Sequence, residues 1–64
     1  MPIVRIEMWP GRPAETKKKI AQDVTKSLVD NIGCPAQAVT VVFDDRPQEN
    51  WAIGGQLQSE MFKK

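Results

Sequence analysis

The sequence predicts an α/β or α+β fold: a single βαβ unit with a parallel two-stranded sheet, followed by a short C-terminal hairpin. Apolar and polar residues alternate over residues 2–9, a second apolar run covers residues 38–43, and the segment between them has helical periodicity. A strand that leads through a helix to a second strand forms a right-handed crossover, so the two strands should be parallel. We expect residues 1–64 to form one domain.

The first strand covers residues 2–9, where Val4, Ile6 and Met8 should face a core. Residues 10–13, with two prolines and a glycine, interrupt the alternating pattern of the strand. Pro13 is well placed as the first residue of a helix, because it lacks only an N–H that would have no partner inside the helix.

The helix should run from residue 14 to about residue 32, because apolar residues recur there at spacings of three and four. This apolar stripe consists of Ile20, Ala21, Val24, Leu28 and Ile32. Gly33 suits the left-handed position just past the helix, and Pro35 stands where the helix can no longer continue.

Residues 38–43 should form the second strand, and residues 44–50 a polar loop. The segment from Trp51 to Gly55 predicts a short turn or hairpin, because its two glycines permit unusual backbone angles. In the tail, residues 56–64, Leu57, Met61 and Phe62 could either fray or pack on a neighbour.

One helix can cover only one face of this sheet. The other face would carry Ile3, Trp9 and Val42, and a two-stranded sheet with an exposed apolar face is not stable in water. A chain of 64 residues builds only a small core, and a single cysteine, Cys34, cannot form an internal disulfide. We therefore expect a second copy of the chain to cover the open face.

Composition excludes several classes of function. A net charge of +1 gives no reason to expect a nucleic-acid or membrane partner. No apolar run approaches the length of roughly 20 residues that spans a bilayer, and a free thiol without a targeting segment suits the cytoplasm. Because the chain has no His, it offers no His base, no Ser-His or Cys-His pair, and no usual metal site.

Pro2 is the most informative residue. Removal of Met1, which is usual before a small residue, would leave a free proline amine. Burial in an apolar site and nearby cations would lower the pKa of that amine toward neutrality, so that it could act as a general base. On residue type alone, the alternative is that Pro2 only opens an edge strand.

Arg12 follows Gly11 in the turn from strand to helix, at the end of the sheet where α/β folds tend to bind ligands. Its guanidinium could hold a carboxylate, or it could be a solvated loop side chain. Trp9 and Trp51 could line an apolar pocket or anchor an interface between subunits.

Four segments together carry a resemblance to a known family: Met1-Pro2-Ile3-Val4, Gly11-Arg12, Val39-Thr40-Val41-Val42 and Asn50-Trp51-Ala52-Ile53-Gly54-Gly55. In this order they resemble the 4-oxalocrotonate tautomerase family. The resemblance covers essentially the whole chain. It implies the tautomerase fold and a homohexamer, a trimer of dimers, whose sites form between subunits.

The resemblance also implies an activity without metal or cofactor. Pro2 would shuttle a proton between the enol and keto forms of a small 2-hydroxy-dienoate or phenylenolpyruvate-type acid, as in the catabolism of aromatic compounds. Arg12 would bind the substrate carboxylate, Trp51 would keep the surroundings of Pro2 apolar, and Trp9 would line the pocket.

The sequence departs from the family pattern at Thr40, where these tautomerases carry a second arginine. Loss of such a charged donor typically costs on the order of a hundredfold in rate. Arg5 or Arg46 of a neighbouring subunit could replace it. The alternatives are a non-catalytic or hetero-oligomeric subunit, or a hydratase or dehalogenase of small unsaturated acids that uses one carboxylate among Glu7, Asp44, Asp45 and Glu49.

Overall fold

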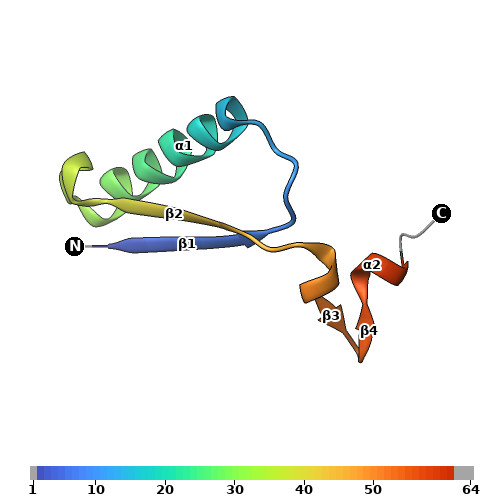
Figure 1. Cartoon of the computed structure of the whole chain (residues 1–64). Coiled ribbons are helices and arrows are strands. Elements are labelled where there is room, and N and C mark those ends of the chain that lie inside the picture. Colours follow the sequence, from blue (N-terminus) through green and yellow to red (C-terminus); the bar gives the residue numbers. More distant parts are fainter. Residues whose placement is uncertain (1, 62–64) are drawn as a thin grey trace.

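The computed structural model describes residues 2–61, so Met1 and Phe62 lie outside the described residues. The elements follow in the order β1 (Ile3–Met8), α1 (Ala14–Ile32), η1 (Ala36–Ala38), β2 (Thr40–Asp45), η2 (Gln48–Asn50), β3 (Ala52–Ile53), β4 (Gln56–Leu57) and α2 (Gln58–Met61). Figure 1 shows α1 along one face of the β1–β2 sheet, and the short elements after β2 as a separate arm.

The sheet confirms the predicted βαβ unit. β1 and β2 pair in parallel, from Ile3 opposite Thr40 to Met8 opposite Asp45. The alternation in β1 places Val4, Ile6 and Met8 on the half-buried side, whereas Ile3 is exposed. Both faces of the sheet therefore carry the side chains that the period-two pattern predicts.

The helix bounds of Ala14–Ile32 confirm the prediction, with one correction at the start. Pro13 has φ −70° and ψ 161°, so it is the extended residue before the helix and not its first helical residue. Its carbonyl accepts hydrogen bonds from the N–H groups of Thr16 and Lys17. At the other end Gly33 adopts φ 84° and donates its N–H to the Val29 carbonyl, as a left-handed helix end requires.

The second strand lies later in the chain than the predicted residues 38–43. It covers Thr40–Asp45, and the residues before it form the single turn η1 (Ala36–Ala38). Asp44 and Asp45 belong to the strand because Glu7 and Met8 of β1 continue the ladder beside them. Backbone pairing therefore overrides the polar character of these two residues, and the polar loop begins at Arg46.

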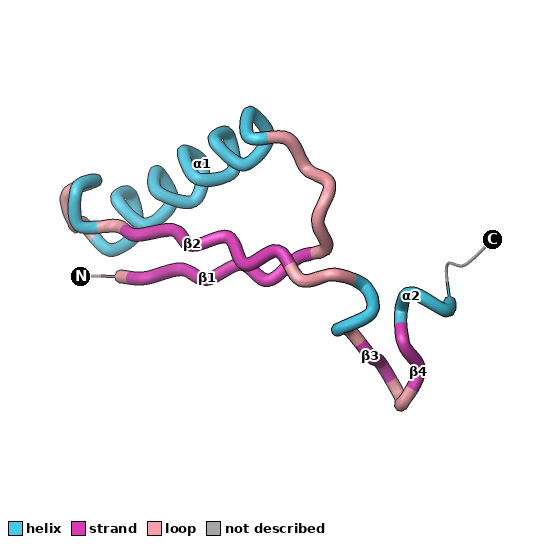
Figure 2. The backbone as a smooth tube through the Cα atoms, viewed as in Figure 1, coloured by secondary structure: helices cyan, strands magenta, loops and turns pink. Residues whose placement is uncertain are grey.

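The predicted C-terminal hairpin is present. β3 and β4 pair antiparallel, and the turn between them has two consecutive left-handed residues, Gly54 with φ 63° and Gly55 with φ 82°. The N–H of Gln58 donates to the carbonyl of Trp51 at 2.8 Å, which closes the base of the hairpin. Figure 2 shows that this arm extends away from the sheet, and the whole chain measures 45 × 25 × 13 Å.

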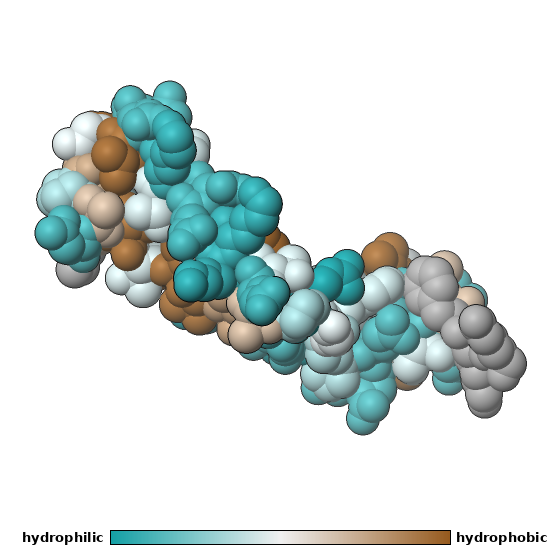
Figure 3. Space-filling view, turned by 90° about the horizontal axis from the view of Figure 1, so that it is seen from above, coloured by the Kyte–Doolittle hydropathy of each residue, from teal (hydrophilic) through white to brown (hydrophobic). Residues whose placement is uncertain are grey.

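None of the apolar side chains in residues 2–61 is buried. On the open sheet face Ile3 is 66% exposed and Val42 36%, and on the arm Ile53 is 63% exposed. Figure 3 shows apolar residues that reach the surface between polar ones on the side viewed. No helix within the described residues is long and apolar enough to cross a membrane.

Candidate active site

Pro2 and Thr40 lie together where the two strands begin. The N–H of Thr40 donates to the Pro2 carbonyl at 3.1 Å, one step before the pairing of Ile3 with Thr40. Pro2 is half-buried. We call this part of the sheet the Pro2 end, and it joins the predicted base to Thr40, the position where the resemblance leads us to expect an arginine.

Trp9 and Trp51 lie together where the strands end. Trp9 directly follows β1, Trp51 directly follows η2, and their ring centroids are 6.0 Å apart with an angle of 78° between the planes. This edge-to-face arrangement suits the charge distribution of aromatic rings. Arg12 follows Trp9 by three residues in the exposed turn to α1. We call this part of the molecule the Trp end.

The turn that carries Arg12 connects the end of β1 to the start of α1, and both of these points are held in place. Nζ of Lys17 in α1 is 2.6 Å from Oδ2 of Asp45 and 5.9 Å from the centre of the Phe43 ring, so the start of the helix is attached to the end of β2. Arg12 itself forms no ion pair within residues 2–61. Its guanidinium is therefore free to receive an anion at the Trp end.

The two ends are separate in a single chain. The six residues of β1 lie between Pro2 and Trp9, which are seven steps apart, and a strand rises about 3.3 Å per residue, so the two ends are separated by about 23 Å. The structure therefore brings Pro2 to Thr40 and Trp9 to Trp51, but it does not bring these two pairs together. No small substrate can contact both within one copy of the chain.

A polar hollow of about 290 Å³ opens beside Trp51, and its other lining residues are Glu7, Arg46, Asn50 and Ala52. The N–H of Arg46 donates to the Met8 carbonyl at 2.8 Å, which fixes this residue at the end of the sheet. Its guanidinium Nη2 is 2.9 Å from Oδ2 of Asp44. Arg46 is one of the two predicted replacement cations, but its pairing with Asp44 was not predicted, although the two residues are two apart and so share a face of an extended chain.

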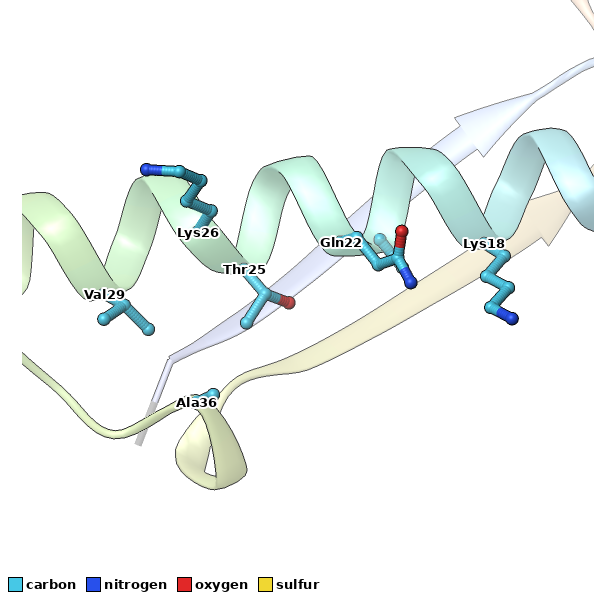
Figure 4. A pocket seen from close by; sticks show the side chains of 7 residues that line it. Lys18, Gln22, Thr25, Lys26, Val29 and Ala36 are labelled. Atoms are coloured by element: carbon cyan, nitrogen blue, oxygen red, sulfur yellow. The ribbon is translucent and has the colours of Figure 1, made fainter.

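A second hollow, of about 470 Å³, runs along one flank of α1. Figure 4 shows its lining by Lys18, Gln22, Thr25, Lys26 and Val29 of the helix and by Ala36 of η1. None of the predicted site residues lines it. It therefore has no part in the candidate site.

Comparison with known proteins decides the family. The family model for Tautomerase, described as a tautomerase enzyme, matches residues 2–61. The 2-hydroxymuconate tautomerase of Comamonas testosteroni is 41% identical over 61 residues, which cover 95% of this chain and 97% of that protein. The chain belongs to the 4-oxalocrotonate tautomerase family. A probable tautomerase of Streptococcus pneumoniae is 38% identical over 60 residues, 94% of this chain and all of that protein.

Solved structures of 4-oxalocrotonate tautomerase relatives share the fold. TomN, a homologue in the tomaymycin biosynthetic pathway, superposes with a TM-score of 0.92 at 25% identity, over 98% of this chain and 97% of its own. An isozyme from Methylibium petroleiphilum has a TM-score of 0.88 at 32% identity, over 97% of this chain and 100% of its own. A heterohexameric tautomerase from Chloroflexus aurantiacus has a TM-score of 0.87 at 26% identity, over 95% of this chain and 98% of its own.

These relatives confirm the resemblance and the predicted fold, and they support a tautomerase activity for this chain. The roles of Pro2, Arg12, Thr40, Trp9 and Trp51 remain predictions. The assembly into a hexamer likewise remains a prediction from the family resemblance.

Proposed function

We propose that the protein is a cofactor-independent tautomerase that interconverts the enol and keto forms of a small 2-hydroxy-dienoate or phenylenolpyruvate-type acid. The observation that carries this proposal is the position of Pro2. Its carbonyl is bound by the Thr40 N–H, which holds Pro2 at the start of the sheet, and its ring nitrogen has no ladder hydrogen bond to lose. Once Met1 has been removed, that nitrogen is a free amine whose position is fixed by the pairing of Pro2 with Thr40.

The chemistry needs one base that returns the proton it takes. The uncharged Pro2 amine removes the enol O–H proton, which leaves an enolate conjugated with the adjacent double bond. The protonated amine then delivers the proton to carbon, at the distal end of the conjugated system in a 2-hydroxy-dienoate or at the carbon beside the ring in phenylenolpyruvate, and the product is the keto acid. Arg12 holds the substrate carboxylate throughout by charge-assisted hydrogen bonds, so that the carbon that accepts the proton stays near the amine.

The complete site requires more than one copy of the chain. Pro2 and Arg12 lie at opposite ends of β1, so the Pro2 end of one copy must meet the Trp end of another. The exposed apolar residues Ile3, Val42 and Ile53 support such self-association, because an isolated chain would leave them in water. One structural relative is itself a heterohexamer, and we propose a homohexamer here.

Replacement of Pro2 tests the base. Intact-mass spectrometry first establishes that the sample lacks Met1. For Pro2→Ala we then expect a loss of about 10²-fold to 10⁴-fold in the rate of ketonisation, followed by ultraviolet absorbance, because a general base contributes an effect of this size. Pro35→Ala is the matched control, since Pro35 is an exposed proline before η1. Undiminished activity of Pro2→Ala would sink the assignment.

Thr40 favours a second candidate, a subunit of a hetero-oligomer whose partner carries the missing arginine. The backbone N–H of Thr40 donates to the Pro2 carbonyl, so a neutral side chain stands next to Pro2 at the position where the family resemblance implies a second arginine. Purification of the native complex followed by mass spectrometry distinguishes the two. A single mass equal to this chain without Met1 supports the homo-oligomeric enzyme, whereas a second tautomerase chain, or retained Met1, supports the alternative.

A further inference from the structure

Three charged side chains at the Trp end are not used by the mechanism above. The guanidinium of Arg46 lies 2.9 Å from Asp44, and its Nε lies 3.9 Å from Oε1 of Glu7. Glu7 and Asp44 are direct partners across β1 and β2, so both carboxylates are on the same face as the one guanidinium. We call these three residues the Arg46 cluster. Two negative charges and one positive charge give it a net negative charge.

The Arg46 cluster forms one side of the hollow beside Trp51. Glu7 and Arg46 line the hollow directly, and the remaining lining groups are uncharged: the Asn50 amide, the Trp51 ring and Ala52. An aromatic group in this hollow would lie against Trp51, and two aromatic rings in contact attract each other. A carboxylate in the same place would approach the Glu7 carboxylate and a guanidinium that is already paired with Asp44, so it would gain little and would be repelled.

We propose that the Arg46 cluster makes the site selective for a monocarboxylate enol with an uncharged aromatic remainder. Arg12, which has no ion pair in residues 2–61, holds the single carboxylate, and the remainder occupies the hollow beside Trp51. Asp44 is then a residue that determines specificity, since it neutralises the cation that a dicarboxylate would need. This inference rests on the proposed function, because Trp51 connects the hollow to the tautomerase site.

The variant Asp44→Asn tests the inference, because it keeps the size of the side chain and removes its charge. The measurement is kcat/KM for phenylenolpyruvate and for 2-hydroxymuconate at low ionic strength. We expect the ratio to shift toward the dicarboxylate by on the order of fivefold, and added salt to reduce the shift, because Arg46 is partly exposed. Glu7→Gln should shift the ratio in the same direction and serves as a second variant should Asp44→Asn fold poorly.

A double-mutant cycle makes the test specific to the cation. If Asp44 acts by neutralising Arg46, then in an Arg46→Gln background Asp44→Asn should produce a smaller shift toward the dicarboxylate. Asp23→Asn is the matched control, because it removes a carboxylate from an exposed ion pair with Lys19 on α1, away from the sheet face. It should leave the ratio unchanged.

The outcomes separate this inference from the function on which it rests. If the wild-type protein shows activity that depends on Pro2, but Asp44→Asn and Glu7→Gln leave the substrate ratio unchanged, the specificity role is overturned and the tautomerase remains. A wild-type protein that prefers 2-hydroxymuconate also overturns it. If the wild-type protein converts neither substrate, both proposals fall.

Discussion

The Pro2 end and the Trp end of one sheet differ in what they offer a substrate. At the Pro2 end a proline and a threonine are joined through the backbone, and neither side chain is charged. At the Trp end the rings of Trp9 and Trp51 meet edge to face, beside the Arg46 cluster, and Arg12 follows in the turn. One end holds the proposed base, whereas the other holds the cation and the aromatic wall.

The separation also explains how a chain with so small a core can form a site. No apolar side chain in residues 2–61 is buried, so one copy alone cannot exclude water from a substrate. Contact between the Pro2 end of one copy and the Trp end of another would bury both ends at once. Assembly would thereby supply the low-dielectric surroundings in which a cation stabilises a developing enolate most strongly.

Mixing two inactive variants gives the largest expected effect. Pro2→Ala removes the base from one end and Arg12→Gln removes the cation from the other, and each alone should lower activity by about a hundredfold or more. After the two are unfolded together and refolded at equal amounts, about a quarter of the shared sites would combine an intact Pro2 with an intact Arg12. The recovered rate of ketonisation measures that fraction.

The control for the mixing experiment uses two variants of the same end. Arg12→Gln mixed with Trp51→Ala should recover far less activity if the cation and the aromatic wall come from one copy, since no mixed neighbour then has an intact Trp end. Recovery in neither mixture would mean that the ends of different copies do not meet. The proposed division of one site between the Pro2 end and the Trp end of different copies would then be wrong.

Thr40→Arg should sharpen the contrast by placing a cation at the Pro2 end. Because one preorganised donor is typically worth about a hundredfold in rate, partial restoration should raise kcat/KM for 2-hydroxymuconate by about tenfold. Ser27→Arg, which adds the same charge to an exposed position on α1, is the control. No gain with Thr40→Arg would indicate that another cation already acts beside Pro2.

Local chemistry made much of the fold predictable. Gly33 predicted the end of α1, because a helix ends where a left-handed residue redirects the chain, and Pro13 marked its start to within one residue. The paired glycines predicted the hairpin for the same kind of reason, since both have positive φ. The contact between the rings of Trp9 and Trp51 was not predicted, because it depends on how the chain folds back after β2 through η2.

Features that depend on partners far along the chain were not predictable. The second strand begins at Thr40 and extends through Asp45 because β1 supplies backbone partners up to Met8, which composition alone does not reveal. The Arg46 cluster likewise depends on the register that sets Glu7 beside Asp44. The division of the site between two ends follows from the length of β1, and the family pattern by itself gives no such distance.

Gly54→Ala should give the smallest effect of these variants. It tests whether the arm of β3 and β4 positions the Trp end or contributes only to the stability of the whole fold. Gly54 has φ 63° and open space around it, so alanine adds backbone strain of about 1 kcal/mol without a clash. Gly33→Ala imposes comparable strain at the end of α1, where φ is 84° and the space is also open. Both variants should unfold at a temperature several degrees lower when measured at equal protein concentration.

The two glycine variants should nevertheless differ in kinetics. The hairpin closes on Trp51 through the Gln58 N–H, so strain at Gly54 should raise KM by disturbing the aromatic wall, whereas strain at Gly33 should leave KM unchanged. Gly54→Asn should recover most of the loss, because asparagine tolerates the left-handed conformation better than alanine. An equal rise in KM for both strained variants would show that Gly54 acts only through global stability, and that the arm does not position Trp51.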